Sequence, residues 1–95
     1  MKTQTLNVGL VGYGMAAKTF HAPLIQAAPG LELTSVVSSD ADKVLRDLPD
    51  VTVHAKLNEL LEVRHVDLIV IATPNEQHYA MAKAALAAGK HVVVD

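Results

Sequence analysis

The residues that could most clearly do chemistry form a glycine-rich turn near the start of the chain. Gly12, Gly14 and Ala17 fit the pattern Gly-x-Gly-x-x-Ala, between the apolar run Leu6–Val11 and a segment with helical spacing. The first glycine permits the tight turn, the second lets phosphate oxygens approach the backbone, and the small third residue lets the helix pack on the strand. The free N–H groups of a helix start favour an anion. We therefore predict that the turn holds the pyrophosphate of a dinucleotide; the alternative is a tight turn without a ligand.

A second candidate site follows the next apolar run, where Ser38 and Ser39 stand. In dinucleotide-binding domains an Asp or Glu at this place binds the 2′-hydroxyl of NAD, and a residue compatible with phosphate suits NADP. Asp40 is expected to cap the following helix instead. The two hydroxyls slightly favour NADP over NAD, although no Arg adjoins them, and Lys43 or Arg46 could reach the phosphate.

The third candidate segment is Thr73-Pro74-Asn75-Glu76-Gln77-His78, directly after the run Leu68–Ala72. A polar turn at the carboxyl end of a central parallel strand faces the crevice in which such sheets bind ligands. Thr73 and Asn75 offer hydrogen-bonding groups, and Pro74 fixes the backbone. The alternative is plain helix initiation, with Asn75 as the cap and His78 exposed. The local pattern does not decide between the two.

These sites need a scaffold of alternating strands and helices, and the pattern predicts one. The runs rich in Val, Ile and Leu that predict buried strands are Leu6–Val11, Leu33–Val37, the weaker Val51–His54, Val66–Ile71 and His91–Val94. The segments between them that predict helices are Met15–Ala28, Asp40–Leu48, Lys56–Glu62 and Asn75–Ala88. We therefore expect the α/β class, with about five parallel strands flanked by helices in one domain, residues 1–95.

Four details of the helices are also predicted. Pro23 removes a backbone donor inside the first helix, so a break is expected near His21–Ala22. In the last helix, Asn75 should be the N-cap and Gly89 should end it with a positive φ. The apolar residues of that helix at i, i+3 and i+7, which share one face, are Tyr79, Ala82 and Leu86.

Composition bounds the function. Hydrophobic residues make up 51% of the 95, which excludes a disordered chain, and 8 Lys plus Arg against 10 Asp plus Glu argue against a nucleic-acid surface. The absence of Cys removes disulfides, zinc fingers and thiol nucleophiles, and it fits a cytoplasmic protein. The apolar runs are far shorter than the ~18 residues of a membrane span. Interrupting glycines disfavour a signal peptide, and the His residues are too scattered for a metal site.

Three motifs in order resemble those of one known family. They are Gly9-Leu10-Val11-Gly12-Tyr13-Gly14, Ala72-Thr73-Pro74-Asn75-x-x-His78 and Ala88-Gly89-Lys90-His91-Val92-Val93-Val94. Together with Phe20-His21-Ala22-Pro23-Leu24-Ile25, they make essentially the whole chain similar to the N-terminal domain of the glucose–fructose oxidoreductase, inositol dehydrogenase and rhizopine-catabolism family (Gfo/Idh/MocA). Within it, the chain is similar to a bacterial subgroup that includes NADP-dependent scyllo-inositol dehydrogenases.

The resemblance implies a Rossmann-type domain of an oxidoreductase that moves hydride between nicotinamide C4 and a carbon of a sugar, polyol or related carbonyl compound. It implies that pyrophosphate, adenosine ribose and nicotinamide-side ribose are bound by residues of the three candidate segments. With the glycine turn, this cofactor-binding set is Gly12, Tyr13, Gly14, Met15, Ala17, Ser38, Ser39, Thr73, Pro74, Asn75 and His78. His21 lies near the cofactor in such proteins, but a bond to a helix-end carbonyl is the favoured interpretation here.

The sequence also departs from the family. Asp95 stands where the family has Glu, and neither the following Lys near the nicotinamide nor the C-terminal substrate domain is among these residues. We therefore expect no catalytic residue in this chain, no activity of the chain alone, and a homo-oligomer for a full-length protein.

Two alternative functions and one physical property follow. The chain could be a non-catalytic dinucleotide-binding or interaction module, or a Rossmann-like methyltransferase, which predicts an acidic residue where Ser38 stands. The final strand, at a sheet edge, predicts self-association or marginal stability.

Overall fold

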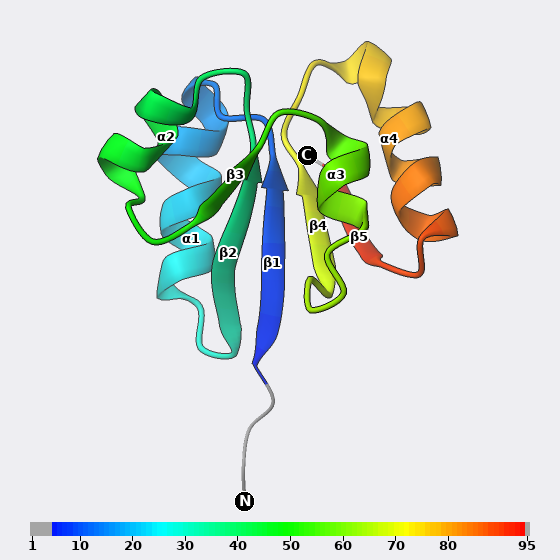
Figure 1. Cartoon of the computed structure of the whole chain (residues 1–95), viewed down its shortest axis with the longest axis horizontal. Helices are drawn as coiled ribbons and strands as arrows, with labels where there is room; N and C mark the ends of the chain where they lie inside the picture. The colour runs from blue at the N-terminus through cyan, green and yellow to red at the C-terminus, as the bar shows by residue number, and fades with distance from the viewer. Residues whose placement is uncertain (1–4, 95) are drawn as a thin grey trace, which may run out of the picture.

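The predicted strands form one parallel sheet. In the computed structural model, which describes residues 5–94, they are β1 (Leu6–Val11), β2 (Leu31–Val37), β3 (Thr52–His54), β4 (Leu68–Ile71) and β5 (His91–Val94). Their spatial order is β3-β2-β1-β4-β5, and every pairing is parallel (Figure 1). The expected fold class is confirmed. Three boundaries differ from the prediction, since β2 starts two residues before Leu33, β3 starts one residue after Val51, and β4 starts two residues after Val66.

The register brings three strand ends to one edge. Val11, the last residue of β1, pairs with Val37 at the end of β2 on one side. On its other side Val11 pairs with Ile71 at the end of β4. The segments that follow these three strands, which carry the three candidate sites, therefore start side by side.

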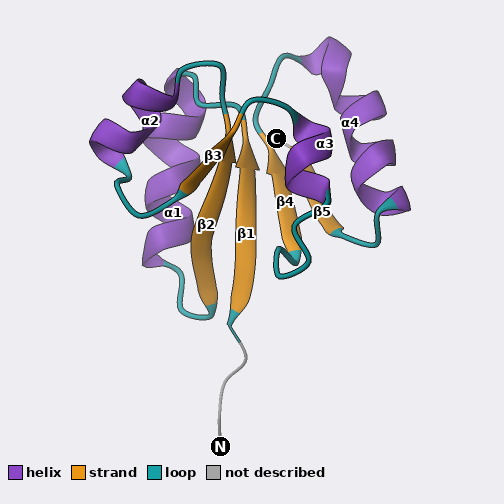
Figure 2. Cartoon of the chain, in the orientation of Figure 1, coloured by secondary structure: helices purple, strands orange, loops and turns teal. Residues whose placement is uncertain are grey.

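Two helical layers cover the sheet (Figure 2). Helices α1 (Ala22–Ala27) and α2 (Ala41–Asp47) lie on one face, and α3 (Leu57–Leu61) and α4 (Asn75–Ala87) lie on the other. Side chains of β1 alternate between the layers, because Val8 and Leu10 pack with α1 and α2 while Val11 packs with α3 and α4. Within residues 5–94, no helix is long and apolar enough to cross a membrane.

The first helical segment is continuous, so the predicted break near His21–Ala22 is wrong. Residues Ala17–His21 form a π-helix, η1, that leads directly into α1. The Ala22 N–H bonds the Ala17 carbonyl, five residues back. This wider turn shifts the hydrogen-bond register so that Pro23, which has no N–H, falls at the first turn of α1, where proline is tolerated.

Helix α4 differs from its prediction in two respects. Pro74 occupies the N-cap position and Asn75 is the first helical residue, so Asn75 is not the cap. Tyr79 is 78% exposed and Leu86 is also exposed, whereas Met81, Ala82 and Ala85 pack on the sheet. In an alanine-rich helix, small residues allow closer approach to the sheet than a stripe of larger ones. The predicted Gly89 terminus is confirmed, with φ of 82°.

Candidate functional site

A cleft of about 460 Å³ opens at the carboxyl ends of β1, β2 and β4. All three candidate segments contribute to it: the glycine turn, the serines after β2 and the turn after β4. The lining residues are Val11, Gly12, Tyr13, Gly14, Val37, Ser38, Ser39, Asp40, Lys43, Ala55, Thr73, Gln77 and Met81. Such a crevice is where open α/β sheets bind their ligands.

Gly12 makes the turn from β1 toward the helix. Its φ is 95°, a conformation that residues with a side chain rarely adopt. A Cβ added there would lie 3.0 Å from the carbonyl oxygen of Ala72. The Gly12 N–H also donates to the Val37 carbonyl at 2.9 Å, which ties the turn to β2. The fold itself therefore requires glycine at this position.

Gly14 differs, because the protein does not require a glycine there. Its φ is not positive, and an added Cβ would meet no atom within 4 Å. The space in front of this backbone faces the cleft, at the start of the helical segment that begins at Met15. That open space fits a pyrophosphate, which approaches the backbone where a Cβ would stand.

Three other residues of this turn have distinct environments. The Met15 side chain is exposed, and Ala17 is fully buried under the sheet, as a small packing residue should be. Tyr13 contributes to the cleft lining, but its side chain is only 6% exposed and packs in the core with α1 and α2. Its hydroxyl donates to Asp47 Oδ2 at 3.0 Å. Burial, together with the hydrogen bond to Asp47, raises the pKa of Tyr13 to about 12.

The segment after β2 is organised by helix capping. Asp40 Oδ1 accepts from the Lys43 N–H at 3.1 Å, as predicted for an N-cap. Ser38 Oγ accepts from the Asp40 N–H at 3.1 Å. The Asp40 carboxylate is therefore used in the turn, while Ser39 is exposed in the cleft beside Lys43.

The segment after β4 brings Thr73 to the cleft. Its hydroxyl donates to Met81 Sδ at 3.5 Å, and its carbonyl accepts from His78 Nε2. His78 is half-buried and does not line the cleft; it braces the turn. Pro74 is exposed, and the side chain of Asn75 lies outside the described residues.

Sequence reasoning missed two residues of α4 that line the cleft, Gln77 and Met81. They are four apart, so they share one helix face. That spacing, counted from Thr73 onward, is the signal that could have revealed them. The structure does not bring His21 to the cleft lining. No group of acidic or histidine side chains suited to a metal ion occurs in the described part of the chain.

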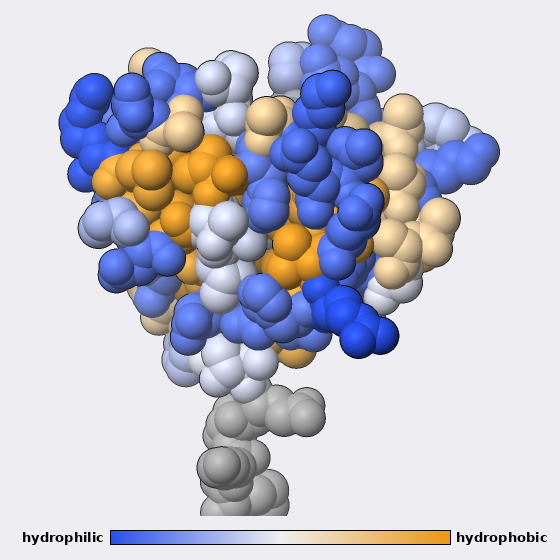
Figure 3. Space-filling model, viewed as in Figure 1, coloured by the Kyte–Doolittle hydropathy of each residue, from blue (hydrophilic) through white to orange (hydrophobic). Residues whose placement is uncertain are grey.

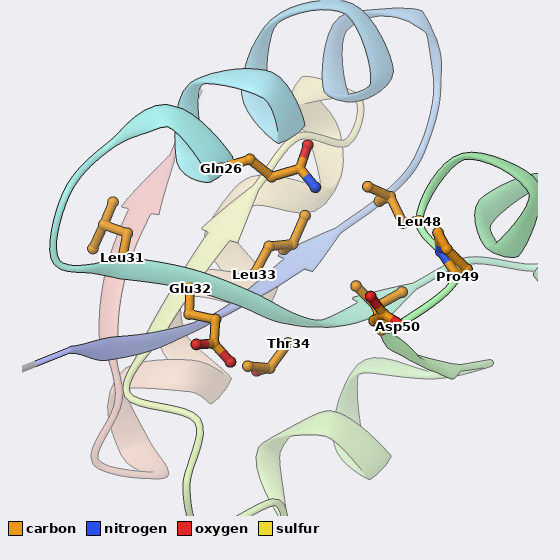
Figure 4. A pocket seen from close by; sticks show the side chains of 9 residues that line it. Gln26, Leu31, Glu32, Leu33, Thr34, Leu48, Pro49 and Asp50 are labelled. Carbon is orange, nitrogen blue, oxygen red and sulfur yellow. The ribbon is translucent and has the colours of Figure 1, made fainter.

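A second hollow of about 390 Å³ lies toward the start of β2 (Figure 4). β3 pairs only with Ser35–Val37, so the preceding part of β2 is left without a neighbour on that side. The residues around it are Gln26, Leu31, Glu32, Leu33, Thr34, Leu48, Pro49, Asp50 and Val51. Apolar surface is visible there in Figure 3. It lies away from the three strand ends and their glycine turn, so the first cleft is the candidate site.

A parallel sheet in this strand order, with a glycine turn after its central first strand and a cleft at the strand ends, defines a Rossmann-type dinucleotide-binding domain. Residues 6–95 match the family model GFO_IDH_MocA, described as "Oxidoreductase family, NAD-binding Rossmann fold". The chain belongs to this family. The resemblance found in the sequence is confirmed, and the methyltransferase alternative is set aside.

Similar proteins include three curated relatives. The chain is 56% identical over 93 residues to the uncharacterized oxidoreductase YdgJ of Escherichia coli, covering 98% of this chain and 27% of that protein. It is 34% identical over 94 residues to the scyllo-inositol 2-dehydrogenase (NADP(+)) IolW of Bacillus subtilis, covering 99% and 26%. It is 41% identical over 93 residues to galactose 1-dehydrogenase of Pseudomonas fluorescens, covering 97% and 29%.

A solved structure agrees. A Klebsiella pneumoniae protein classed as an oxidoreductase superimposes with a TM-score of 0.92 at 57% identity, covering 96% of this chain and 26% of that one. The chain thus spans about a quarter of the length of the relatives it matches.

Proposed function

We propose that this chain is the cofactor-binding part of an NADP(H)-dependent oxidoreductase that acts on a CH–OH or carbonyl group of a sugar or polyol. The observation that carries the proposal is the open space before Gly14, which the protein's own atoms leave unfilled at the start of a helix. Relatives that act on scyllo-inositol and on galactose support the substrate class.

Each part of the cleft has a role in this proposal. The backbone at Gly14 and Met15 binds the pyrophosphate, and Ser39 with Ser38 binds the adenosine ribose. Thr73 and Gln77 border the nicotinamide side, with Pro74 and His78 shaping that turn. The bound cofactor supplies the hydride or accepts it. Ala17 lets the helix pack closely on the sheet, and Asn75 begins α4 at the rim.

The preference for NADP over NAD rests on the charges beside the ribose site. A carboxylate that binds the 2′-hydroxyl of NAD would repel the 2′-phosphate of NADP. Asp40 is the carboxylate nearest in sequence, and it is held in the N-cap of α2. Lys43 lines the same wall and supplies a positive charge. The NADP named for the inositol dehydrogenase relative supports this preference.

Titration with NADPH and with NADH, followed by nicotinamide fluorescence, tests the proposal. We expect both to bind, NADPH more tightly. Lys43→Gln should weaken NADPH binding about threefold to tenfold and leave NADH binding nearly unchanged, because only NADPH carries the 2′-phosphate. Absence of binding of either nucleotide up to millimolar concentration would refute the proposal. Equal effects of the variant on both nucleotides would refute the NADP preference.

The length of the relatives favours a more limited function for the isolated chain. Hydride transfer requires donor and acceptor held in near-attack geometry, which needs a substrate site as well as a cofactor site. We propose that the chain alone binds the dinucleotide without turnover, and that the whole protein is a cytoplasmic homo-oligomer. Oxidation of scyllo-inositol or galactose by the isolated chain would contradict this part of the proposal.

A further inference from the structure

Tyr13 stands between the two glycines of the turn, yet its side chain is buried in the core of the domain. The ring is buried in the core with residues of α1 and α2, the two helices that cover the same face of the sheet in Figure 1. The hydroxyl reaches Asp47, the last residue of α2, at 3.0 Å. The residue that separates Gly12 from Gly14 is thereby bonded to a helix 34 residues further along the chain.

Asp47 joins α2 to a second element as well. Its Oδ2 lies 3.3 Å from Lys18 Nζ on η1. The helix dipole disfavours a negative charge in the last turn of a helix. The contacts of Asp47 with Tyr13 and Lys18 offset this unfavourable interaction. The hydrogen bond from Tyr13 lowers the pKa of the Asp47 carboxyl, and Lys18 lowers it further.

The contact lies at the edge of a surface hollow. A shallow hollow of about 180 Å³ lies between α1 and α2, bordered by Tyr13, Lys18 and Asp47. Tyr13, Ala22 and Leu48, which belong to the buried core, also border this hollow. The polar contacts of Asp47 therefore add to the apolar packing that holds α2 beside Tyr13 and η1.

The position of α2 matters for the cleft. Its N-cap Asp40 and its first-turn residue Lys43 line the same cleft as the glycine turn. Lys43 Nζ also lies 6.0 Å from the centre of the Tyr13 ring, within reach of a cation–π attraction. Tyr13 therefore contacts α2 twice. Its hydroxyl bonds Asp47 in the last turn, and its ring lies near Lys43 in the first turn.

We propose that Tyr13 is a positioning residue: through Asp47 it holds α2 so that Ser39 and Lys43 are placed to bind the adenosine half of the cofactor. The proposal rests on the proposed function, because it concerns the same cleft. It assigns the residue between the two glycines a part in cofactor affinity that does not depend on direct contact between its side chain and the nucleotide.

The test measures the affinity of the full 95-residue chain for 2′,5′-ADP, the adenosine half of NADP, by calorimetry. Tyr13→Phe keeps the ring and removes the hydroxyl, and the dissociation constant should rise about threefold to tenfold. Tyr79→Phe is the matched control, since Tyr79 is exposed and also has a lysine, Lys83, 6.0 Å from its ring. That control should bind as the wild type does.

Variants of Asp47 separate positioning from stability. Asp47→Asn keeps an oxygen that accepts from Tyr13 and should bind nearly as well as the wild type. Asp47→Ala should match Tyr13→Phe, and the double variant Tyr13→Phe/Asp47→Ala should be no worse than either single variant. If Tyr13→Phe does not fold, Asp47→Ala against Asp47→Asn gives the same comparison.

The outcomes are distinguishable. Equal 2′,5′-ADP affinities with only a lower melting temperature would show a purely structural role and overturn this inference alone. A wild-type chain that binds neither NADPH nor 2′,5′-ADP would overturn the proposed function and this inference together.

Discussion

Gly12 and Ala72 lie in contact across the ends of two neighbouring strands, so that a Cβ on Gly12 would lie 3.0 Å from the Ala72 carbonyl oxygen. The Ala72 N–H in turn donates to the carbonyl of Val11 at 3.0 Å. The turn after β1 is therefore built directly against the turn after β4. The two candidate segments that are farthest apart among the three in the sequence share one wall of the cleft.

Substituting Gly12 with Ala should destabilise the fold. The new methyl group must adopt a φ of 95° and approach the Ala72 carbonyl. We expect a loss of about 2–3 kcal/mol in the free energy of unfolding. Urea denaturation followed by circular dichroism measures it. A Gly12→Ala variant as stable as the wild type would show that the turn can relax in another way.

Substituting Gly14 with Ala should leave the stability of the fold unchanged or slightly higher and weaken NADPH binding. Beyond the adjoining backbone, no atom of the protein lies within 4 Å of the added Cβ, and φ is not positive, so stability should stay equal or rise by up to about 1 kcal/mol. The methyl group would occupy the space proposed for the pyrophosphate, so NADPH affinity should fall more than tenfold. Denaturation and NADPH titration of one preparation check both. A stable Gly14→Ala variant with unchanged NADPH affinity would show that the space is not used.

Local chemistry explains what the sequence predicted well. The bounds of β1 and β5, the Asp40 cap and the positive φ of Gly89 each depend on a few consecutive residues with strong preferences. The clustering of the three polar segments followed from the parallel topology, which places strand ends at one edge.

Features that depend on distant partners were not predictable in the same way. The core requires helix both before and after Pro23, because Ala17 and Ile25 are both buried. Pro23 disfavours an uninterrupted α-helix there, and the π-helix Ala17–His21 accommodates it. The bond between Tyr13 and Asp47 joins residues whose proximity depends on how α2 packs. Helix α4 has two faces that carry apolar residues. Packing against the sheet buries the face with Met81 and Ala85 and leaves Tyr79 and Leu86 exposed.

The edge strand β5 should make the isolated chain self-associate. It pairs with β4 on one side, and Val93 is 50% exposed. An exposed apolar edge can pair with another chain, and lysine on an edge strand opposes this. Val93→Lys should therefore reduce concentration-dependent association in sedimentation experiments. Leu24→Lys, an exposed site on α1, is the control and should change it little. A wild-type chain that stays monomeric with a sharp two-state melt would refute the prediction.

The contact between Tyr13 and Asp47 should also be visible in the pH dependence of stability. The pKa of Asp47 lies below its ordinary value of 3.8 in the folded chain, chiefly because Tyr13 donates a hydrogen bond to the carboxylate, with Lys18 and Arg46 adding positive charge. A carboxyl whose folded pKa is lowered contributes stability above its unfolded pKa, and that contribution disappears as pH falls through the folded pKa. Wild type should therefore lose stability relative to Asp47→Asn as pH is lowered from about 5 to below 3, as urea denaturation at each pH would measure. In a Tyr13→Phe background this pH-dependent difference should shrink, because the largest cause of the lowered pKa is gone. A difference between wild type and Asp47→Asn that stays constant across this range would mean that the carboxylate is not held by its partners in solution.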